Sequence, residues 1–227
     1  ETEVVAWLPA LHRGAWFLST PAESDIEMIN DLAGKKVGLY LEQAQQTAWT
    51  KAVMDAAGVD PGQYNYYAFA DGRDAMLAGQ IDALLVLATQ GRLVAPPYAQ
   101  VVGDQDMSAV QIPADVLERA QEDQPKLKWM EVTRENLNED TYEFDSVNGF
   151  LIDSTIVTRA EKDNQAVYDM TKAVIDNQED LEDYNPVLQW FGFGENRNGF
   201  SGFPSGIKLH EGAKQYYDEE GIDYPEP

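Results

Sequence analysis

The chain has 227 residues, 44% of them hydrophobic, and its 40 acidic residues outnumber 16 basic ones to give a formal net charge of −24. A surface of that charge repels nucleic acids and anionic lipid headgroups, which excludes both as general partners. The absence of cysteine excludes disulfides, thiolate metal ligands and cysteine nucleophiles, and only two, widely separated histidines are present. This leaves little material for a histidine-rich metal site or a Ser-His-Asp triad, and we expect no catalytic residue, no metal and no cofactor.

The acidic residues are spread along the chain rather than collected in one block. Such a surface stays hydrated in concentrated salt, which also screens the repulsion between carboxylates. We therefore expect a halophilic source. No apolar run is long enough to span a bilayer, and no signal-peptide pattern precedes Glu1, so we expect a processed or shortened product.

Strands and helices alternate in the first part of the chain. Apolar and aromatic runs predict two strands within 4–19 around a turn at 9–14, then strands at 35–40, 64–69 and 81–87. Periodic segments closed by glycine predict helices at 24–34, 45–57 and 71–79. This alternation predicts an α/β protein with a mainly parallel sheet flanked by helices.

The remainder of the chain becomes increasingly helical. Further strands are predicted at 101–102, 128–132 and 147–158, and helices at 113–122, 164–177, 181–191 and 209–222. Between the last two helices, the glycine-rich loop 192–206 carries Phe193, Phe200 and Phe203. We expect these rings to pack the loop onto a helix; a mobile lid is the alternative interpretation.

Three segments together resemble one family. Asp31–Val37 (DLAGKKV) and Asp74–Ala83 (DAMLAGQIDA) are similar to elements of many extracytoplasmic solute-binding proteins. Leu209–Ile222 (LHEGAKQYYDEEGI) resembles the terminal L-H-P-G-A-x-x-Y-Y-x-E-x-G signature of the TAXI family, the solute receptors of one class of TRAP transporter. Glu211 replaces the usual proline, which is tolerable because a carboxylate suits the positive end of a helix dipole.

The resemblance implies a type II periplasmic-binding-protein-like fold of two lobes that close over a small solute. Residues 20–150 would form one lobe, while 1–19 and 151–227 would supply crossing strands and the helices of the other. The usual N-terminal segment of that second lobe, with its Thr-Gly-Gly-x-Tyr loop, is expected to be missing. The Tyr-Tyr helix is expected to lie on the outside as a docking element, with structural packing as the preferred alternative.

The resemblance also implies a function without catalysis. A monomeric receptor would capture a small polar solute, an amino acid such as glutamate or glutamine or a related organic acid. It would deliver this solute to TRAP-type membrane permease subunits. Its location would be extracytoplasmic, in the periplasm or at the outer face of the cell membrane, with a lipid anchor on a preceding segment as one option.

The first group of candidate ligand residues follows the predicted strand 35–40 and opens the helix 45–57. Its members are Tyr40, Gln43, Gln45, Gln46 and Thr47. Unpaired N–H groups at such a helix start bind anionic ligand groups, and glutamine amides both donate and accept hydrogen bonds. The family usually has a Gly-Ser-Gly-Thr type loop here, of which only Thr47 matches. Glu42 would attract an ammonium group, which favours a polar or zwitterionic solute; a solvated helix start is the alternative.

A second group follows the predicted strand 81–87 and comprises Thr89, Gln90 and Arg92. A plain turn is the alternative there. Arg92, or else Arg73, could hold a ligand carboxylate in bidentate geometry, although a surface ion pair explains either arginine equally simply. Trp7 and Tyr40 could stack on an apolar part of the solute, with a core position as the alternative for Trp7.

Two other classes of function stay open at this point. An enzyme on the same fold is one, since fold does not fix function, but no nucleophile motif such as G-x-S-x-G is present. The ligand-sensing module of a signalling receptor is the other. A membrane permease gene nearby would favour transport, whereas a kinase domain in the same reading frame would favour sensing.

Overall fold

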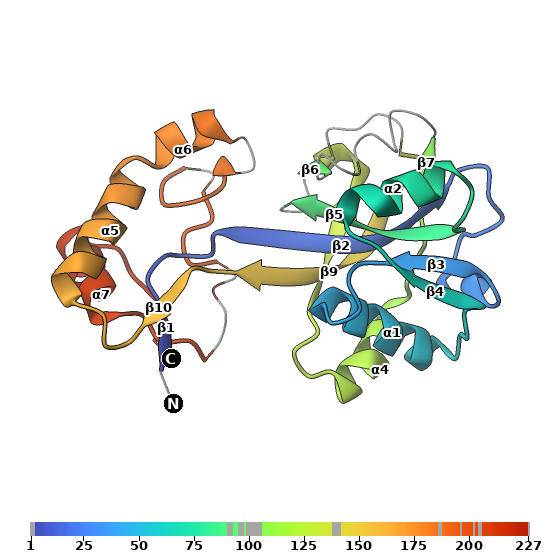
Figure 1. Cartoon of the computed structure of the whole chain (residues 1–227), viewed down its shortest axis with the longest axis horizontal. Helices are drawn as coiled ribbons and strands as arrows, with labels where there is room; N and C mark the ends of the chain where they lie inside the picture. The colour runs from blue at the N-terminus through green and yellow to red at the C-terminus, as the bar shows by residue number, and fades with distance from the viewer. Residues whose placement is uncertain are drawn as a thin grey trace. The chain divides into compact units, whose positions relative to one another are not determined.

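The computed structural model describes residues 3–89, 93–94, 98, 106–137, 142–185, 188–195, 197–201, 203 and 206–226. The chain forms two compact units, shown in Figure 1. Unit 1 comprises residues 1–13 with 153–227, and unit 2 comprises residues 14–152. The chain passes between them within two strands, β2 (His12–Pro21) and β9 (Ser146–Ser154). The boundaries expected from the sequence, at 19/20 and 150/151, fall inside the same two strands.

Unit 2 contains one eight-stranded sheet in the order β4-β3-β5-β2-β9-β8, with β6 paired to β5 and β7 to β2. Its other strands are β3 (Lys36–Leu39), β4 (Gln63–Tyr66), β5 (Ala83–Thr89), β6 (Leu93–Val94), β7 (Met107–Ala109) and β8 (Trp129–Thr133). Its helices are η1 (Ile29–Leu32), α1 (Gln45–Ala57), α2 (Phe69–Leu77), α4 (Ala114–Asp123) and η2 (Arg134–Asn136).

The sheet of unit 2 is mixed. β3 runs parallel to β4 and β5, whereas β2 runs antiparallel to β5 and β8 antiparallel to β9. The predicted α/β class is confirmed, but the expectation of a mainly parallel sheet was wrong. The reason is connectivity: the parallel neighbours β3, β4 and β5 follow one another through helices α1 and α2, whereas β8 returns to its antiparallel neighbour β9 through the short η2 alone.

Helices cover both faces of this sheet. α1 and α4 pack against each other on one face and α2 lies on the other (Figure 1). All seven residues of β5 are buried, as the apolar run 81–87 indicates for a central strand covered on both sides. Helix α1 ends at Gly58, whose φ of 69° gives the left-handed C-cap that glycine adopts without strain.

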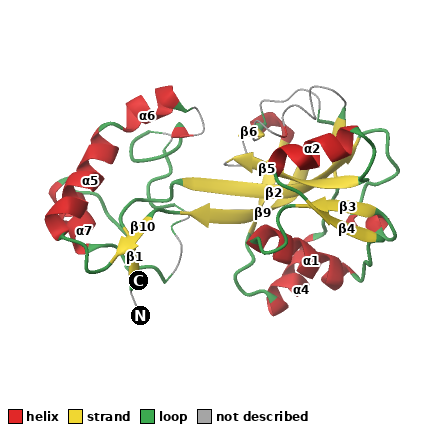
Figure 2. Cartoon of the chain, viewed as in Figure 1, coloured by secondary structure: helices red, strands yellow, loops and turns green. Residues whose placement is uncertain are grey.

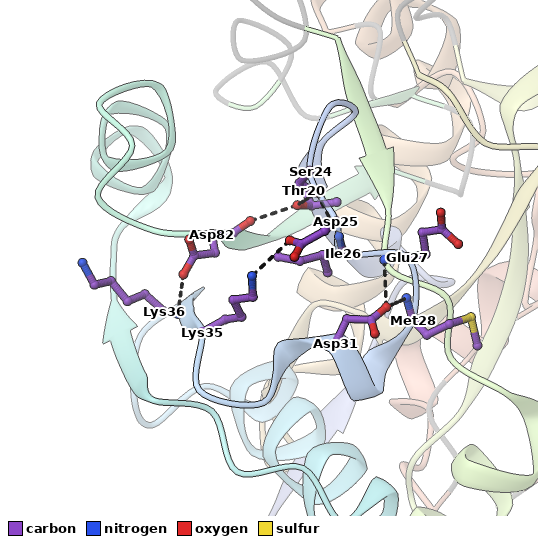
Figure 3. Close-up of polar contacts among 10 residues, drawn as sticks. All are labelled: Thr20, Ser24, Asp25, Ile26, Glu27, Met28, Asp31, Lys35, Lys36 and Asp82. Carbon is purple, nitrogen blue, oxygen red and sulfur yellow. Dashed lines mark hydrogen bonds and ion pairs between the residues drawn. The ribbon is translucent and has the colours of Figure 1, made fainter.

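Two segments that carry the resemblance meet at the amino-terminal end of β3, shown in Figure 3. An Oδ2 atom of Asp31 accepts hydrogen bonds from the backbone N–H groups of Glu27 and Met28, at 3.0 and 2.8 Å. Asp82 Oδ2 accepts from the Lys36 N–H at 2.7 Å, while the Asp82 N–H donates to the Lys36 carbonyl at 2.8 Å. Both aspartates therefore fix backbone and belong to the framework.

Asp82 is also bonded to a third strand, β2: the Thr20 hydroxyl donates to the backbone carbonyl of Asp82 at 2.9 Å (Figure 3). We expect Asp82→Ala to destabilise unit 2 by about 1.5–3 kcal/mol, since a charge-assisted bond to a backbone donor is lost. Urea unfolding measures the change. The matched control is Asp74→Ala, whose exposed pair with Arg73 contributes about 0–1 kcal/mol. Equal losses in the two variants would contradict a framework role for Asp82.

The described residues of unit 1 include a short strand pair and helices α5, α6 and α7, drawn in yellow and red in Figure 2. β1 (Val4–Ala6) pairs antiparallel with β10 (Val157–Arg159), with Val5 opposite Thr158. The helices are α5 (Asn164–Asp176), α6 (Gln178–Tyr184) and α7 (Glu211–Glu219). A separate apolar core lies among them and includes Trp7, Leu8, Val167, Phe191 and Tyr217.

The His-x-Gly-Ala start of α7 is a packing device. His210 is buried and caps the helix, with Nδ1 accepting from the Gly212 N–H at 3.1 Å and Nε2 lying 3.1 Å from the Lys162 carbonyl oxygen. A Cβ on Gly212 would overlap the backbone of Asn164 in α5, so only glycine permits this approach.

The tyrosines of α7 lie in the core. Tyr216 is 2% exposed and Tyr217 fully buried, and the Tyr217 hydroxyl donates to the Trp7 carbonyl at 3.0 Å. The expectation that this Tyr-Tyr helix presents a docking surface was wrong for both rings, because they pack into the apolar core of unit 1. The preferred alternative, structural packing, is confirmed.

The phenylalanine-rich loop packs onto the same helix, as expected. The rings of Phe193 and Phe200 lie 5.7 and 5.2 Å from that of Tyr217. Gln178 fixes the loop backbone, since its amide donates to the Phe193 carbonyl at 2.7 Å and accepts from the Phe193 N–H at 2.9 Å.

Three element predictions need separate comment. The strand expected over 147–158 is interrupted, and β9 and β10 are distinct. The helix expected over 181–191 ends at Tyr184, because the residue before Pro186 disfavours helical geometry. The strand expected at 101–102 lies outside the described residues.

Candidate functional site

The start of helix α1 is the centre of the candidate site. β3 ends at Leu39, and a short turn leads through Tyr40 to Ala44, the N-cap residue. The alanine at the N-cap offers no side-chain acceptor, and the first turn of the helix contains no acidic residue. The first N–H groups of a helix lack intrahelical acceptors and carry the positive end of its dipole. An oxygen-rich ligand group at this end would satisfy donors that the protein itself leaves open.

Thr47 lies in the first turn of α1 and is fully buried. Its Oγ1 is a buried polar atom without a hydrogen-bond partner in the part of the chain that the structure describes. The Cα–Cβ bonds of a helix tilt toward its N-terminus, so the Thr47 side chain leans toward the start of α1. One turn later, the buried Thr50 hydroxyl donates to the Gln46 carbonyl at 2.8 Å. The Thr50 hydroxyl therefore has a hydrogen-bond acceptor within the fold, whereas the Thr47 hydroxyl has no partner among the described residues.

The remaining predicted residues of this turn differ in exposure. Gln43 and Gln45 are exposed, Gln46 is buried, and Tyr40 is half-buried. The exposed amides are open to a solute directly, whereas a solute reaches the covered Thr47 hydroxyl only if neighbouring side chains move. Glu42, immediately before this group, is also exposed.

The second predicted group is described only in part. Thr89 is the last residue of β5, is buried, and pairs with Gly14 of β2. It lies at the same carboxyl edge of the parallel strands as Tyr40, because β3 and β5 run in the same direction. Gln90 and Arg92 lie outside the described residues.

An aromatic cluster borders this edge, and sequence reasoning missed two of its three members. The Tyr40 ring lies 5.5 Å from the Trp16 ring at 43°. Burial raises the pKa of Tyr98, and its proximity to Tyr40 adds to that rise. Trp16 reaches this position through the pairing of β2 with β5, where it is opposite Leu87. Trp16 and Tyr98 are buried, so of the three rings the half-buried Tyr40 is the one whose surface suits a partly apolar ligand.

Two other candidates have structural positions. Arg73 pairs with Asp74 at 2.6 Å, which is the surface ion pair given above as the alternative. Trp7 is 7% exposed and belongs to the core of unit 1.

Two hollows lie at the other end of the unit 2 sheet. One of about 740 Å³ is lined by Glu131, Arg134 and Asp145 among others, and one of about 440 Å³ by Ser24, Glu27 and Gln111 among others. Neither includes a predicted ligand residue. In the smaller hollow two polar side chains already bond to the framework, since Gln111 donates to the Ser146 carbonyl and Ser108 to that of Glu143.

Within the described ranges, no group of three or more histidine, aspartate or glutamate side chains is placed to hold a metal ion. None of the helices built from those residues has the length and apolarity needed to cross a membrane.

Comparison with known proteins identifies a family. The model of the NMT1-like family matches residues 12–221. No curated protein sequence matches the chain. Among solved structures, it is similar to an ancestral arginine-binding protein bound to arginine, at 16% identity over 84% of this chain and 65% of that chain, with a TM-score of 0.46.

Two further structures show the same level of similarity. The periplasmic aliphatic sulphonate-binding protein from Escherichia coli shares 16% identity over 81% of this chain and 54% of that chain, with a TM-score of 0.40. The substrate-binding protein of an amino acid ABC transporter shares 14% identity over 83% and 63%, with a TM-score of 0.38. The chain thus spans less than two thirds of each of these structures.

Proposed function

Since the chain belongs to the NMT1-like family, we propose that it is an extracytoplasmic solute-binding protein that captures a small polar solute without catalysing a reaction. The two units act as the lobes of this receptor, and residues 40–47 of unit 2 contact the solute. An amino acid such as glutamate or glutamine, or a related organic acid, fits the donors and amides of that turn. Delivery is to a TRAP-type permease, as the resemblance of residues 209–222 implies.

One observation carries this proposal: the fully buried Thr47 hydroxyl has no partner within the described residues, at the uncapped start of α1. Leaving a buried hydroxyl unsatisfied costs about 1–3 kcal/mol, which a purely structural site would avoid with valine. A solute oxygen at the helix start would satisfy the hydroxyl together with the open N–H groups.

The residues around this point define the solute further. A carboxylate suits the N–H groups of α1, the glutamine amides accept or donate as required, and Glu42 offers a charge for an ammonium group. Tyr40 and Trp16 supply an aromatic border for the carbon skeleton. Together these features favour a zwitterion over a simple dicarboxylate.

The test is thermal melting in concentrated salt with glutamate, glutamine, other amino acids and 2-oxo acids added singly. A solute present at 100 times its Kd should stabilise the protein by about 2.7 kcal/mol, because it binds only the folded state. A set of solutes that leaves the melting temperature unchanged would count against an intact site.

Thr47→Val should abolish or weaken the solute response while leaving the free protein as stable as before, or more so, because an unsatisfied hydroxyl is removed. Thr50→Val is the matched control on the same helix. It should cost about 1 kcal/mol through its lost bond to the Gln46 carbonyl and keep the solute response. An unchanged response in Thr47→Val would exclude this hydroxyl from the site.

A further inference from the structure

The chain crosses between its two units at two places only, between Arg13 and Gly14 and between Ile152 and Asp153. The residues on the unit 1 side of these crossings form an ion pair. Arg13 Nε donates to Asp153 Oδ1 at 2.9 Å, and the side chains are only 22% and 7% exposed. Of the ion pairs between described residues, this one joins the two crossing strands.

Further bonds join the same two segments within unit 1. The Leu11 N–H donates to the Ser154 carbonyl at 2.8 Å, and the Thr155 hydroxyl donates to the Leu8 carbonyl at 2.9 Å. Arg13 Nη2 also lies 3.5 Å from Ser201 Oγ, in the phenylalanine-rich loop. The guanidinium is therefore held from β9 and from the loop at once.

On the unit 2 side, the two strands approach each other through small residues. A Cβ on Gly149 of β9 would lie 3.3 Å from Ala15 Cβ and 3.5 Å from the Trp16 carbonyl oxygen, so the strands are closely packed there. Gly14, which immediately follows Arg13, has no side chain to restrict its backbone. The ion pair thus lies directly before the point at which β2 joins the sheet of unit 2, where Gly14 pairs with Thr89.

From this arrangement we propose that the Arg13–Asp153 pair clamps the two crossing strands into one element and thereby limits the range of relative orientations that the units sample. β2 and β9 are already neighbouring strands of one sheet, and the ion pair adds a side-chain link to their backbone pairing, so the two connections resist bending separately. Because Asp153 is nearly buried, concentrated salt screens this pair less than the exposed pairs of the surface. The clamp thus remains effective under the saline conditions expected for so acidic a chain.

The test uses distances between two spin labels, because the chain has no native cysteine. Labels are placed at Ala173→Cys on α5 of unit 1 and Glu118→Cys on α4 of unit 2, both exposed positions. Pulsed electron resonance then gives the distribution of distances without any solute. We expect Arg13→Gln to broaden this distribution. Arg73→Gln, which removes an arginine–aspartate pair away from the crossings, should leave it unchanged.

Arg13→Gln alone removes the guanidinium from a nearly buried carboxylate, which destabilises unit 1. The double variant Arg13→Gln/Asp153→Asn leaves no charge there, and circular dichroism checks that it folds. It too should broaden the distribution. Distributions from the folded variants that superimpose on the parent would overturn the proposal.

The effect on solute capture rests on the proposed function, and it is measured separately. A wider range of orientations lowers the fraction of binding-competent molecules, so the apparent Kd should rise in the double variant. If the distances broaden but no solute binds the parent protein, the clamp stands and the proposed function fails. A broadened distribution with an unchanged Kd would show that the clamp does not influence capture.

Discussion

Replacing Gly212 by alanine, which adds one methyl group, should strongly destabilise unit 1. The new Cβ would overlap the carbonyl of Asn164, which is backbone and cannot rotate away. Overpacking of this kind costs about 1–3 kcal/mol, and we expect the upper end because α5 and α7 must separate. Their separation would also strain the His210 cap and its contact with Lys162. Urea unfolding followed by near-UV circular dichroism measures the loss, since the tyrosines of α7 report on this core.

Gly72→Ala is the control for this change. Gly72 also lies within a helix, but a Cβ there would meet only side-chain atoms of Leu84 and Tyr67, at 3.0 Å or more. Those side chains can shift, and alanine favours a helix over glycine by about 1 kcal/mol, so the net change should be small or positive. If Gly212→Ala proved as benign as Gly72→Ala, the close approach of α7 to α5 would be contradicted.

Removal of salt should destabilise the whole protein strongly. With 40 acidic residues against 16 basic ones, repulsion between carboxylates grows as the screening length rises from about 3 Å at 1 M salt to about 30 Å at 0.01 M. Self-repulsion of this kind disfavours the compact state. We expect the melting temperature to fall steadily on dialysis from molar to millimolar sodium chloride. An unchanged melting temperature would refute the halophilic interpretation of the composition.

Helix α6 should respond to salt first. It carries Glu179, Asp180, Glu182 and Asp183 within seven residues and has no buried residue. Among described residues, its cationic partner is Arg197, which reaches Glu182 at 2.8 Å. Hydrogen exchange should therefore accelerate in α6 before it does in α5 as salt is withdrawn. Sucrose in place of salt is the control, because it stabilises compact states without screening charge.

Local signals predicted most elements because they depend on nearby residues. Helix α1 runs over 45–57 as its periodicity and Gly58 indicate. The interruption between β9 and β10 depends instead on distant partners: Thr155 bonds to Leu8, far away in the chain. The antiparallel direction of β2 in the unit 2 sheet likewise follows from pairing with β5, which no local pattern contains.

In the candidate site, too, the sequence predicts what depends on local patterns and misses what depends on long-range contacts. The turn 40–47 could be located because a strand followed by a helix start is a local pattern, and the resemblance singled out Thr47. The sequence does not reveal that the Thr47 hydroxyl is buried without a described partner while Thr50 is satisfied, because burial depends on tertiary packing. Trp16 and Tyr98 were missed for the same reason, since long-range contacts bring them to Tyr40.

The framework and the site also occupy opposite ends of the same strands. Asp31 and Asp82 fix the amino-terminal end of β3, where their carboxylates bind backbone N–H groups of the protein. Beyond its carboxyl-terminal end, helix α1 begins after Ala44, an N-cap residue without a side-chain acceptor. A rigid sheet with satisfied donors at one end and open donors at the other is suited to holding a solute at the open end.

Amide chemical shifts during a titration test this central claim most directly. With a solute that raises the melting temperature, we expect the largest shifts at the backbone N–H groups of Gln45, Gln46 and Thr47, which would gain an acceptor. The amide resonance of Lys36, whose N–H is already bonded to Asp82, should not shift and serves as an internal reference. Saturating solute that shifts amides elsewhere and leaves the first turn of α1 unchanged would contradict the account.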